Sequence, residues 1–176
     1  MKVILGVSGS IGAYKALDVM RLFQKNQHEV TVVMTRSATR IIAPLAFETF
    51  APGKVFVELF APGQDPLLHL NLSRENDLLL VAPATANIIG KMANGIADDL
   101  LSTLFCAFYK RVVVAPAMNT HMLENPAVVD NIARLRGRGV EVIEAAEGLL
   151  ANRETGRGRL PDAEVIYDHC LKTRRV

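Results

Sequence analysis

The stretch Val3-Ile4-Leu5-Gly6-Val7-Ser8-Gly9-Ser10-Ile11-Gly12 decides the fold, because an apolar run leads through a Gly-rich turn into a helical pattern. Such a turn points backbone N–H groups and the positive end of the helix at an anion. It therefore predicts a phosphate-binding loop, with a tight turn that binds nothing as the alternative. The spacing is not that of the dinucleotide-binding fingerprint, and the Gly-Lys-Ser/Thr of a P-loop is missing.

The same alternation continues along the chain. Apolar runs predict strands buried on both faces at Val3–Val7, Val30–Met34, Leu78–Ala82, Val112–Ala115 and Val140–Ile143. Amphipathic patterns predict helices at Ile11–Gln27, Thr85–Met92, Asp98–Phe108 and Asn125–Gly137. Only Ala61–Asp65 and Ala151–Gly158 are expected to be weakly structured. We predict an α/β fold with a doubly wound, Rossmann-like (flavodoxin-like) parallel sheet, in a single domain over residues 1–176.

The composition is that of an ordinary globular protein. Half of the 176 residues are hydrophobic, 22% are charged, and the net charge is +2. These values disfavour disorder and a charge-driven nucleic-acid partner. Cys106, on a helix that looks buried, and Cys170 have no metal-ligand spacing, so we expect neither a disulfide framework nor a metal site. No apolar run suits a signal peptide or a membrane span, and we expect a cytoplasmic protein without a membrane partner.

Ligands of such sheets bind beyond the carboxyl ends of the strands, so the loops at 8–12, 35–37, 83–87 and 116–122 should meet at one edge. After the second strand the chain offers Thr35-Arg36-Ser37, where an NAD-binding fold offers an acidic residue to the ribose. Two hydroxyls and a guanidinium suit a phosphate better than a diol. A mononucleotide with a terminal phosphate, such as FMN, fits these loops better than NAD.

Two of these loops share one pattern. Each ends a buried strand with Ala-Pro-Ala and places an asparagine soon after it, Asn87 in one loop and Asn119 in the other. Small residues allow a flat ligand to approach, and an amide offers both a donor and an acceptor to the ligand edge. The alternative is that both asparagines are helix N-caps.

Together these residues resemble the family of flavin-containing cysteine decarboxylases over nearly the whole chain. The resemblance rests on five motifs in the order of the family, namely Ser8–Lys15, Leu68-His69-Leu70, Ala82–Asn87 with Gly95–Ser102 behind it, Pro116–Asn119 with Met122, and Gly156–Leu160. A generic flavodoxin-like protein would not supply all five, so the signal is specific to the family.

The resemblance implies a role for each matching position. His69 is the implied active-site base, and Asn119 is the residue that binds the substrate carboxylate. Met122, Asn152 and Arg159 are further substrate-binding positions, and basic residues such as Arg159 would suit a substrate phosphate. Thr35, from the loop pattern above, is predicted to contact FMN. The resemblance implies the other FMN positions, which are Gly9, Ser10, Ile11, Ser37, Thr85, Ala86, Asn87 and Ala117.

The implied activity is FMN-dependent oxidative decarboxylation of 4′-phosphopantothenoylcysteine towards 4′-phosphopantetheine in coenzyme A biosynthesis. The resemblance also implies a homotrimer, often assembled into a dodecamer, with FMN and His69 contributed by neighbouring subunits. A phosphopantothenoylcysteine ligase is a further implied partner. Two alternatives stay open: a peptidyl-cysteine decarboxylase that forms an enethiol, and a flavin-binding regulatory subunit without catalysis.

One position departs from the family pattern. Members of the coenzyme A pathway usually carry a cysteine four residues before the Gly-x-Gly-Arg motif, and this thiol gives the proton for the final reduction. Asn152 stands there in this chain, and an amide cannot serve as that acid. The sequence leaves open whether the reaction stops at the enethiol or another group, such as Glu154 or water, gives the proton.

Overall fold

The computed structural model describes residues 1–172, and its centre is one parallel sheet. Within these residues six strands lie in the order β3-β2-β1-β4-β5-β6. The strands are β1 (Lys2–Val7), β2 (Glu29–Met34), β3 (Val55–Phe56), β4 (Leu78–Ala84), β5 (Arg111–Pro116) and β6 (Glu141–Val142). The order reverses direction between β1 and β4, where an open α/β sheet forms its ligand crevice.

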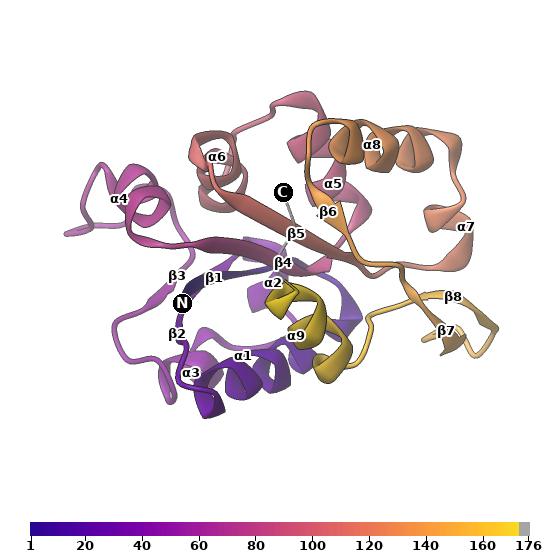
Figure 1. Ribbon diagram of the computed structural model, residues 1–176, viewed down its shortest axis with the longest axis horizontal. Coiled ribbons are helices and arrows are strands. Elements are labelled where there is room, and N and C mark those ends of the chain that lie inside the picture. Colours follow the sequence, from indigo (N-terminus) through magenta and orange to yellow (C-terminus); the bar gives the residue numbers. More distant parts are fainter. Residues whose placement is uncertain (173–176) are drawn as a thin grey trace.

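Helices cover both faces of the sheet, as Figure 1 shows. On one face lie η1 (Ile11–Lys15), α1 (Ala16–Lys25), α3 (Pro44–Glu48) and α9 (Ala163–Leu171). On the other lie α4 (Leu68–Glu75), α5 (Ala86–Asn94), α6 (Leu100–Ala107) and α8 (Pro126–Gly137). The buried apolar residues form two clusters, one on each side of the sheet. The predicted doubly wound α/β architecture is therefore confirmed.

Two of the connections at the carboxyl edge of the sheet each contain a short helix. The helix α2 (Arg36–Thr39) follows β2, and α7 (Thr120–Leu123) follows β5. Both are single turns, too short to leave an apolar period in the sequence.

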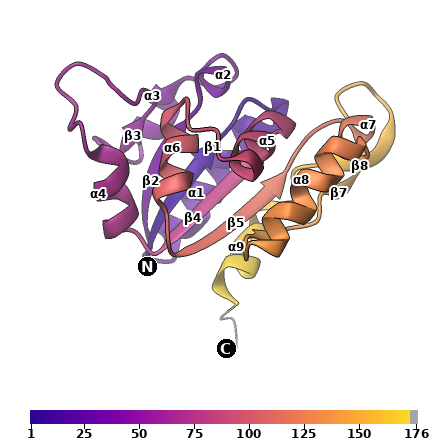
Figure 2. The same cartoon turned by 90° about the horizontal axis from the view of Figure 1, so that it is seen from above.

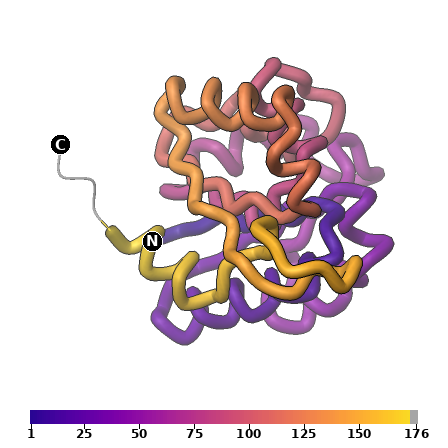
Figure 3. The backbone as a smooth tube through the Cα atoms, turned by 90° about the vertical axis from the view of Figure 1, so that its right-hand side faces the viewer, coloured from indigo at the N-terminus to yellow at the C-terminus, as the bar shows by residue number. Residues whose placement is uncertain are grey.

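An antiparallel hairpin lies outside the main sheet and corrects one prediction. Strands β7 (Ala146–Leu149) and β8 (Thr155–Arg159) pair with each other, so most of Ala151–Gly158 is ordered as a turn and a strand. Figure 3 looks onto this end of the molecule, where the hairpin lies in front of the sheet edge. Three of the nine residues in β7 and β8 are glycines, which hides the alternating pattern because glycine weakens strand propensity. The pairing depends on contacts with distant loops.

The structure differs from the sequence patterns at two further places. His69 lies in the first turn of α4, a helix that the amphipathic patterns did not predict. Cys106 is exposed on α6, although its apolar neighbours suggested burial, whereas Cys170 is buried. In both helices the periodic pattern is short, so a shift of one residue changes which side chain faces the sheet.

Candidate functional site

The four loops predicted to meet at one edge of the sheet do so. Ser8, which is buried, ties the first loop to the third: its Oγ donates to the carbonyl of Pro83 at 2.8 Å and accepts from the N–H of Thr85 at 3.0 Å. The fourth loop joins them because the N–H of Ala117 donates to the carbonyl of Ala84 at 2.9 Å. Parallel strands end at the same edge, so the register of the sheet brings these loops together.

The second loop is pressed against the first. A Cβ placed on Gly9 would lie 2.5 Å from the Cβ of Ser37, so only glycine fits at this point. Thr35 lies at the N-cap of α2, where its hydroxyl accepts from the N–H of Ala38 at 3.2 Å. Gly9 and Ser37 therefore form one surface.

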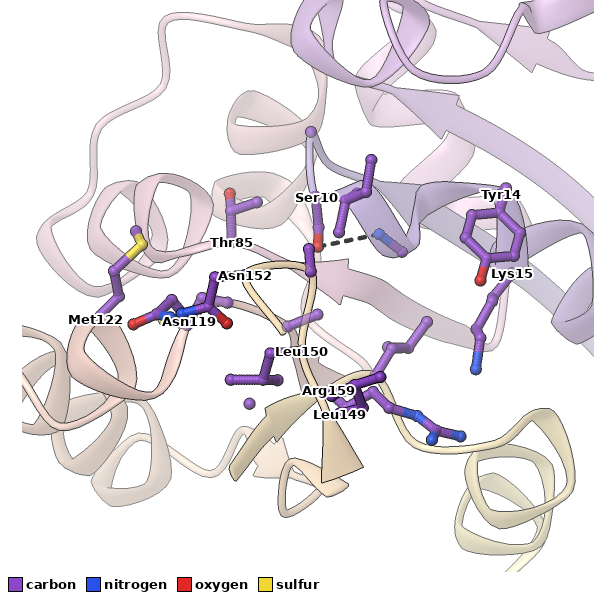
Figure 4. Close-up of a pocket in the computed structure, with 18 residues that line it drawn as sticks. Ser10, Tyr14, Lys15, Thr85, Asn119, Met122, Leu149, Leu150, Asn152 and Arg159 are labelled. Carbon is purple, nitrogen blue, oxygen red and sulfur yellow. Dashed lines mark hydrogen bonds between the residues drawn. The ribbon is translucent and has the colours of Figure 1, made fainter. Parts of the chain in front are cut away.

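A pocket of about 690 Å³ opens at this edge, a volume typical of sites for small molecules and cofactors. It is lined by residues of the first loop and η1, by Thr85, by the β5–α7 loop and by the hairpin. The predicted site residues that line it are Gly9, Ser10, Ile11, Thr85, Ala117, Asn119, Met122, Asn152 and Arg159. In Figure 4, Met122 and Asn119 lie on one side of the pocket, and Tyr14 and Lys15 lie on the other.

The predicted alternative of helix capping holds for one of the two asparagines. Oδ1 of Asn119 accepts from the N–H of His121 at 2.9 Å and caps α7. Asn87 does not cap α5, because Thr85 does so through its hydroxyl. The cap occupies only the amide oxygen of Asn119, and the amide nitrogen remains a donor at the pocket wall.

The hairpin packs directly on the β5–α7 loop, which explains the Gly-x-Gly motif. A Cβ on Gly158, whose φ is +142°, would lie 2.1 Å from the carbonyl oxygen of Met118. A Cβ on Gly156 would lie 2.4 Å from Oγ1 of Thr120, which donates to the carbonyl of Arg157 at 2.7 Å. The two glycines therefore bring the hairpin close enough to form one wall of the pocket.

The pocket also has a charged rim. Nη2 of Arg159 lies 3.1 Å from Oδ1 of Asp162, and Nζ of Lys15 lies 3.7 Å from the same oxygen. Nε of Arg159 is buried and has no hydrogen-bond partner among residues 1–172. Two cations that share one carboxylate leave net positive charge beside the pocket, which favours an anionic ligand.

Several predicted residues lie outside this pocket. Thr35, Ser37, Ala86 and Asn87 flank it but do not line it. His69 lies on α4, at the opposite end of the molecule from the hairpin in Figure 2. Its Nδ1 is buried and, in the part of the chain that the structure describes, has no hydrogen-bond partner. A single chain therefore does not bring His69 to the pocket.

Some residues that line the pocket were not predicted to be site residues. Tyr14 and Lys15 follow the Gly-rich loop in η1, and Leu149 and Leu150 belong to the hairpin. The adjacent Gly-rich loop could have indicated Tyr14 and Lys15, because a helix that starts at a ligand presents its first turn to it. No sequence signal marks Leu149, because its place depends on the packing of the hairpin.

The lining fits a flat aromatic ligand that carries a phosphate, as FMN does. Apolar side chains stay exposed on the pocket walls, with 66% exposure for Ile11, 66% for Leu149 and 48% for Met122. Exposed apolar side chains around a concave pocket suit a planar ring system. Because Gly9 has no side chain, the first loop lies directly against Ser37, and Gly9 and Ser10 of this loop line the pocket.

Residues 1–172 contain neither a cluster of metal ligands nor a helix that could span a membrane. Nowhere in residues 1–172 do three His, Cys, Asp or Glu side chains converge as they would around a metal ion. In the same residues, every helix is too short or too polar to span a bilayer.

The chain is similar in sequence and in fold to proteins of known activity. The bifunctional coenzyme A biosynthesis protein CoaBC of Mycobacterium tuberculosis is 44% identical over 165 residues, which cover 94% of this chain and 39% of that protein. The chain thus spans about two fifths of the length of this relative.

Among solved structures, a cysteine-to-serine mutant of PPC decarboxylase in complex with pantothenoylaminoethenethiol superposes with a TM-score of 0.85. Its identity is 31%, and the match covers 96% of this chain and 95% of that one. The FMN-dependent cysteine decarboxylase SpaF superposes with a TM-score of 0.80 at 28% identity, covering 97% of both chains. The family described as Flavoprotein matches residues 1–175, and this chain is a member of it.

Proposed function

We propose that this chain is an FMN-dependent decarboxylase that converts 4′-phosphopantothenoylcysteine towards 4′-phosphopantetheine in coenzyme A biosynthesis. The observation that carries the proposal is the pocket at the carboxyl edge, where a Gly-rich loop, an Ala-Pro-Ala loop and Asn119 face one another. Relatives named for coenzyme A biosynthesis and for PPC decarboxylation support the substrate. The relative named for coenzyme A biosynthesis is longer than this chain, and the proposal concerns only the part of it that this chain matches.

The first and second loops would hold the cofactor. Gly9, Ser10 and Ser37 are assigned to its phosphate, and Ile11 with Thr85 to its ring system. Ala86, Asn87 and Ala117 would complete this surface, and Thr35 supports it through its cap of α2. When bound, FMN supplies a two-electron oxidation of the cysteinyl group, which creates the electron sink that loss of CO₂ requires.

The β5–α7 loop would hold the substrate. The amide nitrogen of Asn119, left free by the helix cap, donates to the cysteinyl carboxylate, and Met122 packs against the cysteinyl chain. Arg159 beside Lys15 attracts the phosphate of the substrate, because both cations lie on the rim. Holding the carboxylate in one orientation favours its loss as CO₂, since alignment of reacting groups lowers the barrier by several kcal/mol, about 7–11 in the best cases.

His69 would act as the base from a second copy of the chain, within a homotrimer or a dodecamer. Its ring is assigned to removal of a proton from the substrate during oxidation. The unpartnered Nδ1 and two exposed apolar side chains at the start of the same helix, Leu67 at 52% and Leu70 at 40%, support a neighbouring subunit at this place. Large exposed apolar side chains close together favour association.

The function is tested with the purified, FMN-loaded protein and 4′-phosphopantothenoylcysteine under anaerobic conditions. We expect release of CO₂ and transient bleaching of the flavin absorbance. His69→Asn should bind FMN unchanged and leave the flavin oxidised, since it removes the base but no cofactor contact. Absence of both CO₂ and bleaching in the unaltered protein would refute the proposal.

Subunit sharing is tested by mixing two inactive variants, His69→Asn and Asn119→Asp. The second variant sets a carboxylate against the substrate carboxylate, so binding should be lost. If each site takes His69 from one copy and Asn119 from another, random mixed oligomers should regain roughly a quarter of the activity. A site built within one chain would regain none, and that result would contradict the shared site.

A peptidyl-cysteine decarboxylase is the second candidate, and Asn152 favours it, because a reaction that ends at the enethiol needs no thiol at this position. SpaF shows that the fold occurs among FMN-dependent cysteine decarboxylases. Conversion of a peptide with a C-terminal cysteine, and failure with 4′-phosphopantothenoylcysteine, would establish this alternative.

A further inference from the structure

The turn between β7 and β8 carries two polar side chains that form a pair at the pocket. The N–H of Leu150 donates to the carbonyl of Glu154 at 2.8 Å and closes the turn. Within it, Nδ2 of Asn152 donates to Oε2 of Glu154 at 2.5 Å, and the N–H of Glu154 faces Oδ1 of Asn152 at 3.4 Å. Asn152 lines the pocket, so the carboxyl group of Glu154 lies one hydrogen bond behind its wall.

The two carboxyl groups near the pocket have different partners. Asp162 lies between Arg159 and Lys15 and forms an ion pair with each of these two cations. Glu154 forms no ion pair with a cation in the described residues 1–172, and its side-chain partner is a neutral amide. An amide can donate to a carboxylate and can accept from a carboxylic acid. Asn152 can therefore orient Glu154 both before and after it loses a proton.

The proposed reduction of the enethiol requires a proton donor. None of the described residues that line the pocket is a cysteine, and Cys106 and Cys170 lie on α6 and α9. Exposure of Glu154 to solvent lets it regain a proton from water after each turnover. A general acid acts within direct hydrogen-bond reach of the reacting atom or through one water, and its contacts tighten when the substrate is bound.

We propose that Glu154 gives the proton that completes the reduction of the enethiol, and that Asn152 positions it. This inference rests on the proposed decarboxylation. In the step, the carbon–carbon double bond of the enethiolate opens, and the carbon that lost CO₂ forms a C–H bond as the O–H bond of Glu154 breaks. The carbon that carries sulfur regains from the reduced flavin the two electrons and the hydrogen that the flavin would have taken up in the oxidation, which leaves the flavin oxidised again. The sum is redox-neutral, and Glu154 is left as a carboxylate.

The test compares FMN-loaded Glu154→Gln with Glu147→Gln, which removes an exposed carboxylate from β7 outside the pocket. One equivalent of 4′-phosphopantothenoylcysteine is added without oxygen, and the flavin absorbance, CO₂ and product mass are recorded. In Glu154→Gln, CO₂ should appear at the normal rate while the flavin stays bleached. Its reoxidation should slow by about 10²-fold, and the product should be two mass units lighter. Glu147→Gln should match the unaltered protein.

Two further measurements separate a chemical role from a structural one. The FMN dissociation constant, followed by fluorescence of the cofactor, should be equal in all variants, because Glu154 is not assigned to cofactor binding. In the Glu154→Gln background, Asn152→Cys should restore the saturated thiol, because a thiol at this position supplies the missing proton. Failure of this rescue with FMN still bound would overturn the assignment of position 152 to the reducing step.

The outcomes distinguish this inference from the proposed function. If the unaltered protein releases no CO₂, the decarboxylase proposal fails. If it decarboxylates and Glu154→Gln reoxidises its flavin at the normal rate, only the role of Glu154 is overturned. If the unaltered protein itself stops at the enethiol, Glu154 is likewise not the donor, and the decarboxylase remains.

Discussion

At the scale of single residues, Gly9 limits how the first loop can change. Its Cβ position lies 2.5 Å from the Cβ and 3.0 Å from the carbonyl carbon of Ser37. Gly9→Ala must push the two loops apart, and overpacking of this kind costs about 1–3 kcal/mol. We expect this loss in urea unfolding of the apoprotein and weaker FMN binding in fluorescence titration.

The matched control is Gly12→Ala, three residues further along. A Cβ at Gly12 would meet its nearest neighbour, the Cβ of Leu160, at an ordinary distance of 3.6 Å. This variant should keep its free energy of unfolding near that of the unaltered protein. Equal effects of the two substitutions would show that close packing against Ser37 does not shape the loop.

At the scale of elements, α6 depends on its N-terminal cap. The side chain of Asp99 accepts from the N–H of Ser102 at 2.8 Å, and the hydroxyl of Ser102 accepts from the N–H of Asp99 at 3.2 Å. Lys91 of α5 lies 2.7 Å from Asp99 and 2.6 Å from Asp98, which joins the two helices. Asp99→Ala should lower the free energy of unfolding by about 1 kcal/mol, because the cap is lost.

Asp98→Ala is the control, since Asp98 pairs with Lys91 but does not cap the helix. Its effect in urea unfolding should be smaller, because exposed ion pairs contribute little. The hydrogen bond from Lys91 lowers the pKa of Asp98. The ion pair therefore stabilises the fold at pH values above the ordinary pKa of an aspartate. This stabilisation is lost as the pH falls through the lowered pKa of Asp98. Below that pH, Asp98→Ala and the unaltered protein should have the same free energy of unfolding. A larger loss for Asp98→Ala than for Asp99→Ala would contradict this order.

At the scale of the whole molecule, Arg111 joins three distant segments. From the start of β5 it forms a bidentate pair with Glu141 of β6, with two N–O distances of 2.9 Å. It also donates to the carbonyls of Cys170 at 2.5 Å and His169 at 3.1 Å, at the end of α9. Burial raises the pKa of the Cys170 thiol to about 12, so little reactive thiolate forms while α9 is packed.

Thiol labelling in a Cys106→Ser background tests this arrangement. Cys170 should react only when urea unfolds the protein. Adding Arg111→Gln should speed labelling at least several-fold under native conditions, because the end of α9 loses its donors and opens more often. Lys54→Ala, which breaks the exposed pair with Glu29, should leave the labelling rate unchanged. Equal labelling rates in both variants would show that Arg111 does not hold the helix.

Much of the fold was predictable because its signals are local. The apolar runs gave β1, β2, β4 and β5 within two residues at each end, and the amphipathic patterns gave α1, α5, α6 and α8. The elements that were missed are short, like β3 and α2, or depend on partners far away in the chain, like β7 and β8. Propensity is a weak guide where tertiary packing provides most of the stability.

The sequence by itself determined the alternation of strands and helices, the sheet edge at which the pocket opens and the loops that meet there, since these follow from apolar periodicity and parallel topology. Only the tertiary structure decided that the hairpin forms a wall of the pocket. It does so because Gly158 and Gly156 have no side chains and can lie close to Met118 and Thr120. It also decided that Glu154 pairs with Asn152 and that His69 lies away from the pocket of its own chain. These facts depend on distances between segments far apart in sequence, which no local pattern encodes.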